Sequence, residues 1–502
     1  MLDTVAGTGR TIAPSGHNND ADGDHKIEVV IIETPNLGDR SYVVAVNGVA
    51  AAIDPQRDID RVQDELAARG WELTHVFETH VHNDYVSGGL ELANVTGAAY
   101  VMPALATVSY PVTTAADGDE FVSGAARWRA VHTPGHTPHH MSYVVSVDGV
   151  DRAVFTGGSM LFGSVGRPDL LGPDHTLGLA HDQWHSVRRL GEVVSDDAAV
   201  HPTHGFGSFC SATETVGTAS TVAEQRATNP AFHLSQDEFV AELLAGLDAF
   251  PAYYAHMGPA NAAGPGPIDL SLPTLADPAE LRRRIDAGEW IVDLRSRRLF
   301  AAGHVRGTLS FDGEGNAITY LGWLIPWGTP VTLLGDSVAQ VEEMQRDLAR
   351  IGIDRPAAHA LGTPEDWALE SSDVVSFRRV GFADLVTARA ADPELLVLDL
   401  RRDLEWSDGH VVGARHLPLH ELLGRTDDVL AWSRSTAEAG LDPTVWAYCG
   451  SGFRAAVAAS ILERAGVPVV HVDQDFDQAA RSGAEIVRPT STSPRLGPTV
   501  TA

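Results

Sequence analysis

The segment that most constrains the fold of this 502-residue chain covers 78–89 and reads Glu-Thr-His-Val-His-Asn-Asp-Tyr-Val-Ser-Gly-Gly. It follows an alternating, strand-like run and precedes a helix-like run over 90–95. His80, His82 and Asp84 occupy alternate positions where the strand ends, so the backbone can aim their side chains at one point. The glycine pair lets the next helix start close to the strand. Imidazole and carboxylate groups at this spacing indicate a metal site.

Two more histidines occur in short loops that contain proline and glycine. His136 lies in the sequence Thr-Pro-Gly-His-Thr, and His204 lies in His-Pro-Thr-His-Gly. Proline and glycine fix such turns, which suits a ligand that must not reorient. Either histidine alone reads equally well as a polar turn residue. Together with His80 and His82 they form a set that favours a metal centre.

The residues around these loops alternate between strand-like and helix-like patterns, as in a layered α/β domain. The Asn-Gly pair at 47–48 predicts a hairpin. An apolar stripe over 59–68 predicts an amphipathic helix that ends at Gly70. The predicted strands cover residues 27–34, 42–46, 49–53, 98–102, 128–131, 141–147 and 153–155.

The charge of the chain limits the classes of partner. Its 67 acidic and 36 basic residues give a formal net charge of −31. Such a chain is a poor match for the phosphates of nucleic acid or for an anionic membrane surface. No apolar run approaches the roughly 18 residues that span a bilayer. The sequence therefore predicts neither a nucleic-acid partner nor a membrane partner.

The chain ends and the cysteine count bear on order and location. Residues 1–26 are rich in Gly, Asn and Asp and lack the apolar core of a signal peptide, which predicts a disordered extension. The Ser/Thr/Pro-rich residues 489–502 predict a disordered tail. Cys210 and Cys449 are the two cysteines, a number that excludes a disulfide framework and favours a reducing, cytoplasmic location.

A Pro/Gly/Ala-rich segment separates the histidine-containing part from an internal repeat. Asp-Leu-Arg recurs at 293 and 399, and Gly-His-Val recurs at 303 and 409, both 106 residues apart. Each copy alternates strands and helices, as a parallel α/β sheet does. The predicted parts are a metal-binding domain, a linker and two similar domains, at 27–260, 261–274, 275–372 and 376–488.

The second copy carries a reactive-cysteine pattern. A predicted strand at 445–448 and a helical run at 455–465 flank the loop Cys449-Gly450-Ser451-Gly452-Phe453-Arg454. The loop N–H groups, the helix N-terminus and the arginine all favour the thiolate form of the cysteine. The two glycines permit the loop to curl around the sulfur. A buried structural cysteine is the alternative, although this sequence is poorly suited to simple packing.

This loop resembles that of the rhodanese family, whose active site is a six-residue C-x-x-x-x-R turn between a strand and a helix. The upstream segments 399–401 and 409–414 fit the same family pattern. The resemblance implies that Cys449 carries a persulfide in a sulfurtransferase reaction, and that Arg454 and the loop amides stabilise its anionic sulfur.

The first copy lacks both of these groups. Gly335 stands where Cys449 does, and Gln340 stands where Arg454 does. The first copy therefore cannot hold a persulfide, and we predict a structural or docking module.

Residues 27–260 resemble the metallo-β-lactamase superfamily, an αββα sandwich with metal ligands at strand ends, and within it the persulfide dioxygenase branch. In that branch a mononuclear Fe(II) is held by one His of H-x-H, the His of P-G-H-T and the Asp of T-G-D. His80 and His136 match the first two, whereas Gly158 stands in place of the aspartate. Further matching segments lie at 132–137, 155–159, 166–169, 201–204 and 224–230.

The resemblance is incomplete at the metal. Tyr85 replaces a histidine ligand used by two-metal hydrolases, which disfavours a binuclear centre. What remains is a three-histidine face suited to mononuclear Fe(II) or to Zn²⁺, with two supporting groups or weak ligands. The histidines are His80, His82 and His136, and the supporting groups are Asp84 and His204. Asp169 is a candidate for the missing oxygen ligand, and a metal-free domain is a further alternative.

We predict an enzyme of sulfur metabolism. Its metal domain would oxidise a low-molecular-weight persulfide, glutathione-like or other, to sulfite with O₂, and its last domain would transfer sulfane sulfur through Cys449. A protein thiol is a further candidate partner, and fusing the two activities raises effective concentration. Two alternatives stay open: a Zn-dependent hydrolase of a thioester-like substrate, and a sulfurtransferase whose metal domain is an inactive scaffold. Iron, zinc or no metal distinguishes the three.

Overall fold

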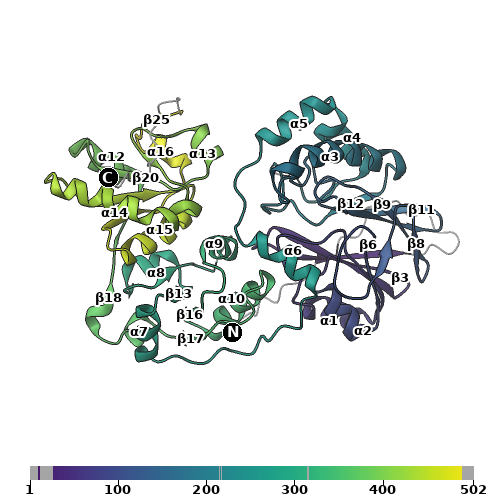
Figure 1. Ribbon diagram of the computed structural model, residues 1–502, viewed down its shortest axis with the longest axis horizontal. Helices are drawn as coiled ribbons and strands as arrows, with labels where there is room; N and C mark the ends of the chain where they lie inside the picture. The colour runs from purple at the N-terminus through teal and green to yellow at the C-terminus, as the bar shows by residue number, and fades with distance from the viewer. Residues whose placement is uncertain (1–9, 12–25, 214, 216, 314–315, 489–502) are drawn as a thin grey trace. The chain divides into compact units, whose positions relative to one another are not determined.

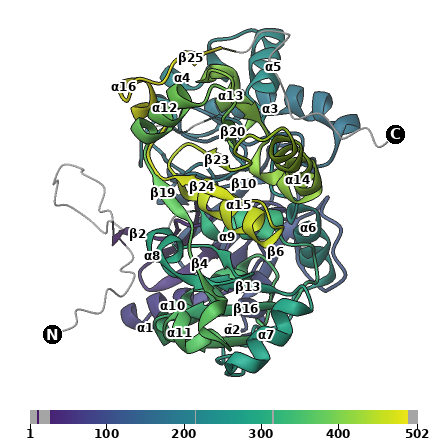
Figure 2. The ribbon, with the colours of Figure 1, turned by 90° about the vertical axis from the view of Figure 1, so that its left-hand side faces the viewer.

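A computed structural model describes residues 10–11, 26–213, 215, 217–313 and 316–488 (Figures 1 and 2). The chain divides into two compact units: Met1–Asp269 with Leu348–Asp354, and Leu270–Asp347 with Arg355–Ala502. The predicted disordered tail at 489–502 lies outside the described residues, as does most of the predicted extension at 1–26.

The first unit contains a seven-stranded sheet and a five-stranded sheet, with strand orders β1-β2-β3-β4-β5-β6-β7 and β12-β11-β10-β9-β8. The first sheet consists of β1 (Arg10–Thr11), β2 (Ile27–Thr34), β3 (Asp39–Val46), β4 (Val49–Ile53), β5 (Glu72–Phe77), β6 (Ala99–Pro103) and β7 (Thr113–Ala115). The second consists of β8 (Glu120–Ser123), β9 (Ala126–His132), β10 (Met141–Val147), β11 (Val150–Gly157) and β12 (Ala199–Pro202). The helices are α1 (Asp60–Arg69), α2 (Gly89–Thr96), α3 (Pro173–Val193), α4 (Val222–Thr228), α5 (Gln236–Ala245) and α6 (Tyr254–Ala263).

Both faces of each sheet are covered. In β3, Tyr42 and Val44 belong to the core between the two sheets, whereas Val43 packs in the cluster that includes α1 and α2. On the second sheet, Val144 of β10 packs in the cluster that includes α3 and α5. Alternate side chains of one strand therefore pack in different hydrophobic cores. Both faces of the strand are buried, which explains why its sequence is a continuous apolar run. The predicted αββα sandwich is confirmed.

One prediction of disorder and one predicted domain boundary differ from the structure. Arg10–Thr11 falls within the predicted extension, yet it forms β1 and pairs antiparallel with Val30 and Ile31. The free edge of β2 accepts such a partner through backbone groups, whatever its composition. Helix α6 extends past the predicted domain end at 260, because Asn261 in its last turn donates hydrogen bonds to the carbonyls of His82 and Tyr85, both at 2.8 Å.

The second unit contains two parallel sheets, with strand orders β15-β13-β16-β17 and β19-β24-β23-β20-β22. The strands are β13 (Trp290–Asp293), β15 (Leu309–Ser310), β16 (Val331–Gly335), β17 (Ala358–Leu361), β19 (Arg378–Val380), β20 (Leu396–Asp399), β22 (Arg415–His416), β23 (Val445–Tyr448) and β24 (Val469–Val472). Two small antiparallel pairs join β14 (His304–Val305) to β18 (Val374–Val375) and β21 (His410–Val411) to β25 (Ile486–Val487).

Helices connect these strands, and α15 packs against β23 and β24 (Figure 2). The helices are α7 (Pro278–Asp286), α8 (Arg297–Ala302), α9 (Ala317–Leu324), α10 (Val338–Arg350), α11 (Pro364–Trp367), α12 (Phe382–Ala391), α13 (Asp403–Asp408), α14 (Leu422–Glu438), α15 (Phe453–Arg464) and α16 (Asp477–Arg481). Among the described residues, no helix combines the length and apolar character needed to cross a bilayer.

The repeat extends to individual hydrogen bonds. In the first copy, Arg295 donates to the Asp293 carboxylate at 2.6 Å and to the Gly303 carbonyl at 2.9 Å. In the second copy, Arg401 donates to Asp399 at 2.8 Å and to the Gly409 carbonyl at 2.6 Å. Each arginine ties the end of a strand to the Gly-His-Val segment, so the recurring sequence letters mark the same buried ion pair.

Candidate functional site

The loop that carries His80, His82 and Asp84 is held by a buried aspartate that sequence reasoning missed. Asp54 follows β4 and accepts hydrogen bonds from the Thr79 backbone N–H at 2.7 Å and from its hydroxyl at 2.8 Å. Burial by itself would raise the pKa of Asp54, but His82 and the hydrogen bonds lower it below its ordinary value. The available signal was its place at the end of an apolar strand.

Three histidines from distant loops meet in the first unit. His80 follows β5, His136 lies between β9 and β10, and His204 follows β12. The Nε2 atoms of His80 and His204 are 3.4 Å apart, and one ring nitrogen from each of the three histidines lies within 4.8 Å of the others. All three side chains are fully buried. The convergence of three imidazole nitrogens in a buried place is a donor set for a transition metal.

Neighbouring groups orient these rings. His136 Nδ1 lies 2.9 Å from the Arg167 carbonyl oxygen, which leaves its buried Nε2 without a hydrogen-bond partner among the described residues. His204 Nδ1 lies 2.9 Å from Asp39 and 3.1 Å from Asp84. A carbonyl or carboxylate on Nδ1 fixes the ring and leaves Nε2 for a metal, so the residues present fit a bound ion.

The pKa values of these histidines divide them into two kinds. Burial, reinforced by the neighbouring histidines, lowers the pKa of His136 to about 3 and that of His80 well below its ordinary value. Both rings are therefore neutral and can donate a lone pair to a metal. Burial also disfavours the charged form of His204, but Asp84 and Asp39 outweigh it and raise its pKa to about 9. Metal binding at His204 therefore displaces a proton.

The two ring nitrogens of His82 have different surroundings. Its Nε2 lies 3.2 Å from Asp54, 3.1 Å from Glu78 and 3.1 Å from the Tyr85 hydroxyl. Burial lowers the pKa of His82, but the two carboxylates raise it well above its ordinary value. This side of the ring is therefore placed to offset buried carboxylate charge. Its buried Nδ1 has no hydrogen-bond partner among the described residues, and His82 forms a second group of possible ligand atoms with Asp84 and His204. His204 thus joins the predicted histidines as a possible ligand.

Position 158, where the resemblance called for an aspartate, lies directly against a histidine ring. A Cβ atom added to Gly158 would lie 2.6 Å from His136 Cγ. Asp169, the candidate for the missing oxygen, is held by Arg167 at 2.7 and 2.8 Å. Asp84 offers a carboxylate oxygen in a group of possible ligand atoms with His82 and His204.

Restoring the aspartate is therefore predicted to impair the metal site. We expect Gly158→Asp to displace the His136 ring, to lower metal content several-fold, and to reduce the free energy of unfolding by about 1–3 kcal/mol, as overpacking does. Metal analysis and denaturant unfolding measure the two effects. A Gly178→Asp control on the exposed side of α3, where φ is negative and an added Cβ meets nothing within 4 Å, tests the effect of charge without a clash. A gain of metal in Gly158→Asp would contradict the steric argument.

In the second unit, Cys449 lies at the turn between β23 and α15. Its side chain is 1% exposed, and the Gly452 N–H donates to Cys449 Sγ at 3.1 Å. Gly452 has φ = 95°, and a Cβ there would lie 3.0 Å from Asp473 Cα, so a side chain at this position is strained and crowded. The loop thus presents a backbone N–H to the sulfur.

Arg454, predicted to stabilise the sulfur, forms an ion pair with a carboxylate. Its Nη1 and Nη2 atoms donate to Glu405 of α13 at 2.6 and 2.7 Å. Burial by itself would raise the pKa of Glu405, but the hydrogen bonds and charge of Arg454 lower it to about 2. Glu405 is a second group that sequence reasoning missed.

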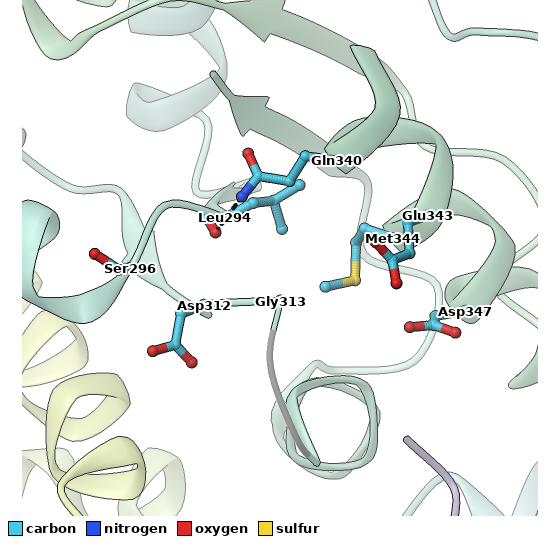
Figure 3. Close-up of a pocket in the computed structure, with 8 residues that line it drawn as sticks. All are labelled: Leu294, Ser296, Asp312, Gly313, Gln340, Glu343, Met344 and Asp347. Carbon is cyan, nitrogen blue, oxygen red and sulfur yellow. Dashed lines mark hydrogen bonds between the residues drawn. The ribbon is translucent and has the colours of Figure 1, made fainter. Parts of the chain in front are cut away.

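The first copy has a different environment at the equivalent turn. Gln340 Nε2 donates to the Leu294 carbonyl at 2.7 Å, and its Oε1 accepts from the Asp336 N–H at 3.1 Å. Beside it lies a cavity of about 210 Å³ (Figure 3). The cavity lining includes the carboxylates of Asp312, Glu343 and Asp347. A cavity lined in this way disfavours an anionic sulfur species, in line with the loss of the cysteine and the arginine.

Comparisons with known proteins match the two units of the chain to two different families. The metallo-beta-lactamase superfamily profile matches residues 40–205, and the rhodanese-like domain profile matches residues 382–481. A crystal structure described as a metallo-beta-lactamase from Staphylococcus aureus superposes with a TM-score of 0.61 at 25% identity, covering 67% of this chain and 99% of that one.

Two kinds of curated relative match the first unit. The hydroxyacylglutathione hydrolase of Rhizobium etli is 31% identical over 36% of this chain, and the match spans 66% of the relative, slightly under two thirds of its length. The mitochondrial persulfide dioxygenase ETHE1 of Bos taurus is 30% identical over 41% of this chain and 72% of its own length. One relative is thus a hydrolase and the other an oxygenase.

Proposed function

Since the chain belongs to the metallo-beta-lactamase superfamily and also carries a rhodanese-like domain, we propose that it oxidises a low-molecular-weight persulfide at a metal centre and transfers sulfane sulfur through Cys449. The observation that carries the metal half is the convergence of His80, His136 and His204 around an unsatisfied His136 Nε2. The loop N–H donated to Cys449 Sγ carries the sulfur half.

The metal half uses the three converging histidines and Asp84. A bound Fe(II) would supply O₂ activation and a Lewis-acid site for an anionic persulfide sulfur. His80 and His136 offer neutral nitrogens, and Arg167 fixes the His136 ring through its carbonyl. Asp39 accepts a hydrogen bond from His204 Nδ1 and so orients the ring. Complete burial of these groups excludes bulk water from the reacting sulfur.

The sulfur half uses the loop of the second unit. Cys449 Sγ attacks the outer sulfur of a donor, a new S–S bond forms as the donor bond breaks, and the electron pair leaves with the donor fragment. The Gly452 N–H then stabilises the persulfide anion on Cys449. A second nucleophile, a small thiol or a protein thiol, removes the outer sulfur and regenerates the Cys449 thiolate.

A zinc-dependent hydrolase is the second candidate, and the match to hydroxyacylglutathione hydrolase favours it. Gly158 and Tyr85 weigh against its two-metal form, because both positions lack a ligand side chain suited to a second metal. The identity of the metal separates the two candidates.

Metal content and O₂ uptake test the proposal. In anaerobically purified protein we expect iron near one per chain and O₂ consumption on addition of glutathione persulfide. Chelation is expected to abolish O₂ uptake and to leave sulfur transfer to cyanide unchanged, because the described Cys449 loop has no group of metal-binding side chains. Zinc with hydrolysis of a glutathione thioester, and no O₂ uptake, would establish the hydrolase instead. If the metal-loaded protein showed neither O₂ uptake nor thioester hydrolysis, the proposed role of the metal site would be overturned.

A further inference from the structure

The ion pair between Arg454 and Glu405 has a geometry that ties up the loop cation. Both terminal nitrogens of Arg454 bind both carboxylate oxygens of Glu405, at 2.6 and 2.7 Å, and the side chains are 12% and 28% exposed. A partly buried fork of this kind is fixed in orientation and strongly attractive. The positive charge of Arg454 is therefore balanced by Glu405 before a sulfur donor binds.

The pair lies against the cysteine loop. A Cβ atom added to Gly450 would lie 2.7 Å from Arg454 Nη2 and 3.3 Å from Glu405 Oε1. The same carboxylate accepts the Arg402 N–H at 3.1 Å and lies 3.4 Å from Arg402 Nε. Glu405 thus stands between two guanidinium groups, which together would suit a doubly charged donor, and it cancels one of the two charges.

Asp473 and His471 also lie beside Gly452, and Asp473 is paired with Arg297 at 2.8 Å. On the Phe453 side of the loop, the neighbouring side chain of Tyr320 adds no charge. Tyr320 of α9, in the first copy of the repeat, packs its ring 5.8 Å from that of Phe453. Burial raises the pKa of Tyr320, so its hydroxyl stays neutral. Apolar and neutral surface on this side accommodates an organic group better than an oxyanion.

Donors of sulfane sulfur differ in the negative charge that they bring to the Cys449 loop. Thiosulfate is a dianion, and after its S–S bond breaks the electron pair leaves with sulfite. An organic persulfide carries one negative charge at its reacting sulfurs, and the pair leaves with an alkyl thiolate that takes up a proton. We propose that Glu405 is a specificity-determining residue that favours organic persulfides over dianionic oxyanion donors at Cys449. This inference rests on the proposed sulfur-transfer function.

The test compares two donors in the full-length protein, with cyanide as acceptor and thiocyanate as product. For Glu405→Gln we expect the ratio of kcat/KM for thiosulfate to that for glutathione persulfide to rise about tenfold, mainly through a lower KM for thiosulfate; tenfold corresponds to about 1.4 kcal/mol. Glutamine retains an oxygen for the Arg402 N–H, so the start of α13 keeps its cap. Glu405→Asp, which keeps the charge, is expected to leave the ratio near that of the native protein.

Asp408→Asn is the matched control, since Asp408 ends the same helix and its side chain is 87% exposed. An unchanged ratio in Glu405→Gln, or an equal fall with both donors, would overturn the specificity role. If the variant fails to fold, the native protein provides a second test. A larger kcat/KM for thiosulfate than for glutathione persulfide in the native protein would also overturn the specificity role. If the native protein showed no Cys449-dependent sulfur transfer with any donor, the proposed function itself would be refuted.

Discussion

Replacing Cys449 by alanine is expected to lower the proposed sulfane-sulfur transfer to cyanide by about 1,000-fold or more, because it removes the atom to which the sulfur would be attached. The substitution also removes the acceptor of the Gly452 N–H, whereas the ion pair of Arg454 with Glu405 does not involve the thiol and is expected to persist. Thiocyanate formation from glutathione persulfide and from thiosulfate, corrected for the uncatalysed rate, measures the effect.

Cys210→Ala is the control for this experiment, because Cys210 is the other cysteine of the chain and is buried in the first unit. We expect it to leave sulfur transfer unchanged. Mass spectrometry of the native protein after donor treatment is expected to show one added sulfur atom on the peptide that contains Cys449. Transfer that persists in Cys449→Ala at the native rate would remove the loop from the mechanism.

Replacing His136 by alanine is the second large effect. The variant loses the ring whose buried Nε2 has no partner among the described residues, and with it one of three converging nitrogens. Disturbing groups that only support a ligand already costs 10–100-fold in metal affinity or activity, so loss of the ligand itself is expected to lower persulfide-dependent O₂ uptake by more than about 100-fold. Metal analysis after gel filtration and an oxygen electrode measure the change.

His175→Ala provides the matched control, because His175 lies on α3 with an exposed side chain. It is expected to retain metal and O₂ uptake. Cys449-dependent sulfur transfer in His136→Ala is expected to equal that of the native protein, which shows that the second unit is folded. Full metal occupancy in His136→Ala would exclude this histidine from the ligand set.

Local sequence was sufficient for most of the secondary structure and for the loops that carry the chemistry. The predicted strands at 27–34, 49–53 and 141–147 coincide with β2, β4 and β10, because apolar runs of this length between turn residues have few other ways to bury themselves. The recurrence of Asp-Leu-Arg identified the repeat, and the structure shows that it forms a buried ion pair in each copy. The fold class followed from these patterns together with the resemblance to known families.

The sequence by itself determined which side chains are available: the histidines in their proline and glycine turns, glycine at position 158, and Cys449 ahead of a helix. The tertiary structure decided how they combine. It brought His204 to His80 across 124 residues, turned His82 toward Asp54, and paired Arg454 with Glu405. A buried charge must be paired with a nearby polar or charged group. The packing of the sheets determines which group is nearby, and the separation of two residues along the chain does not predict it.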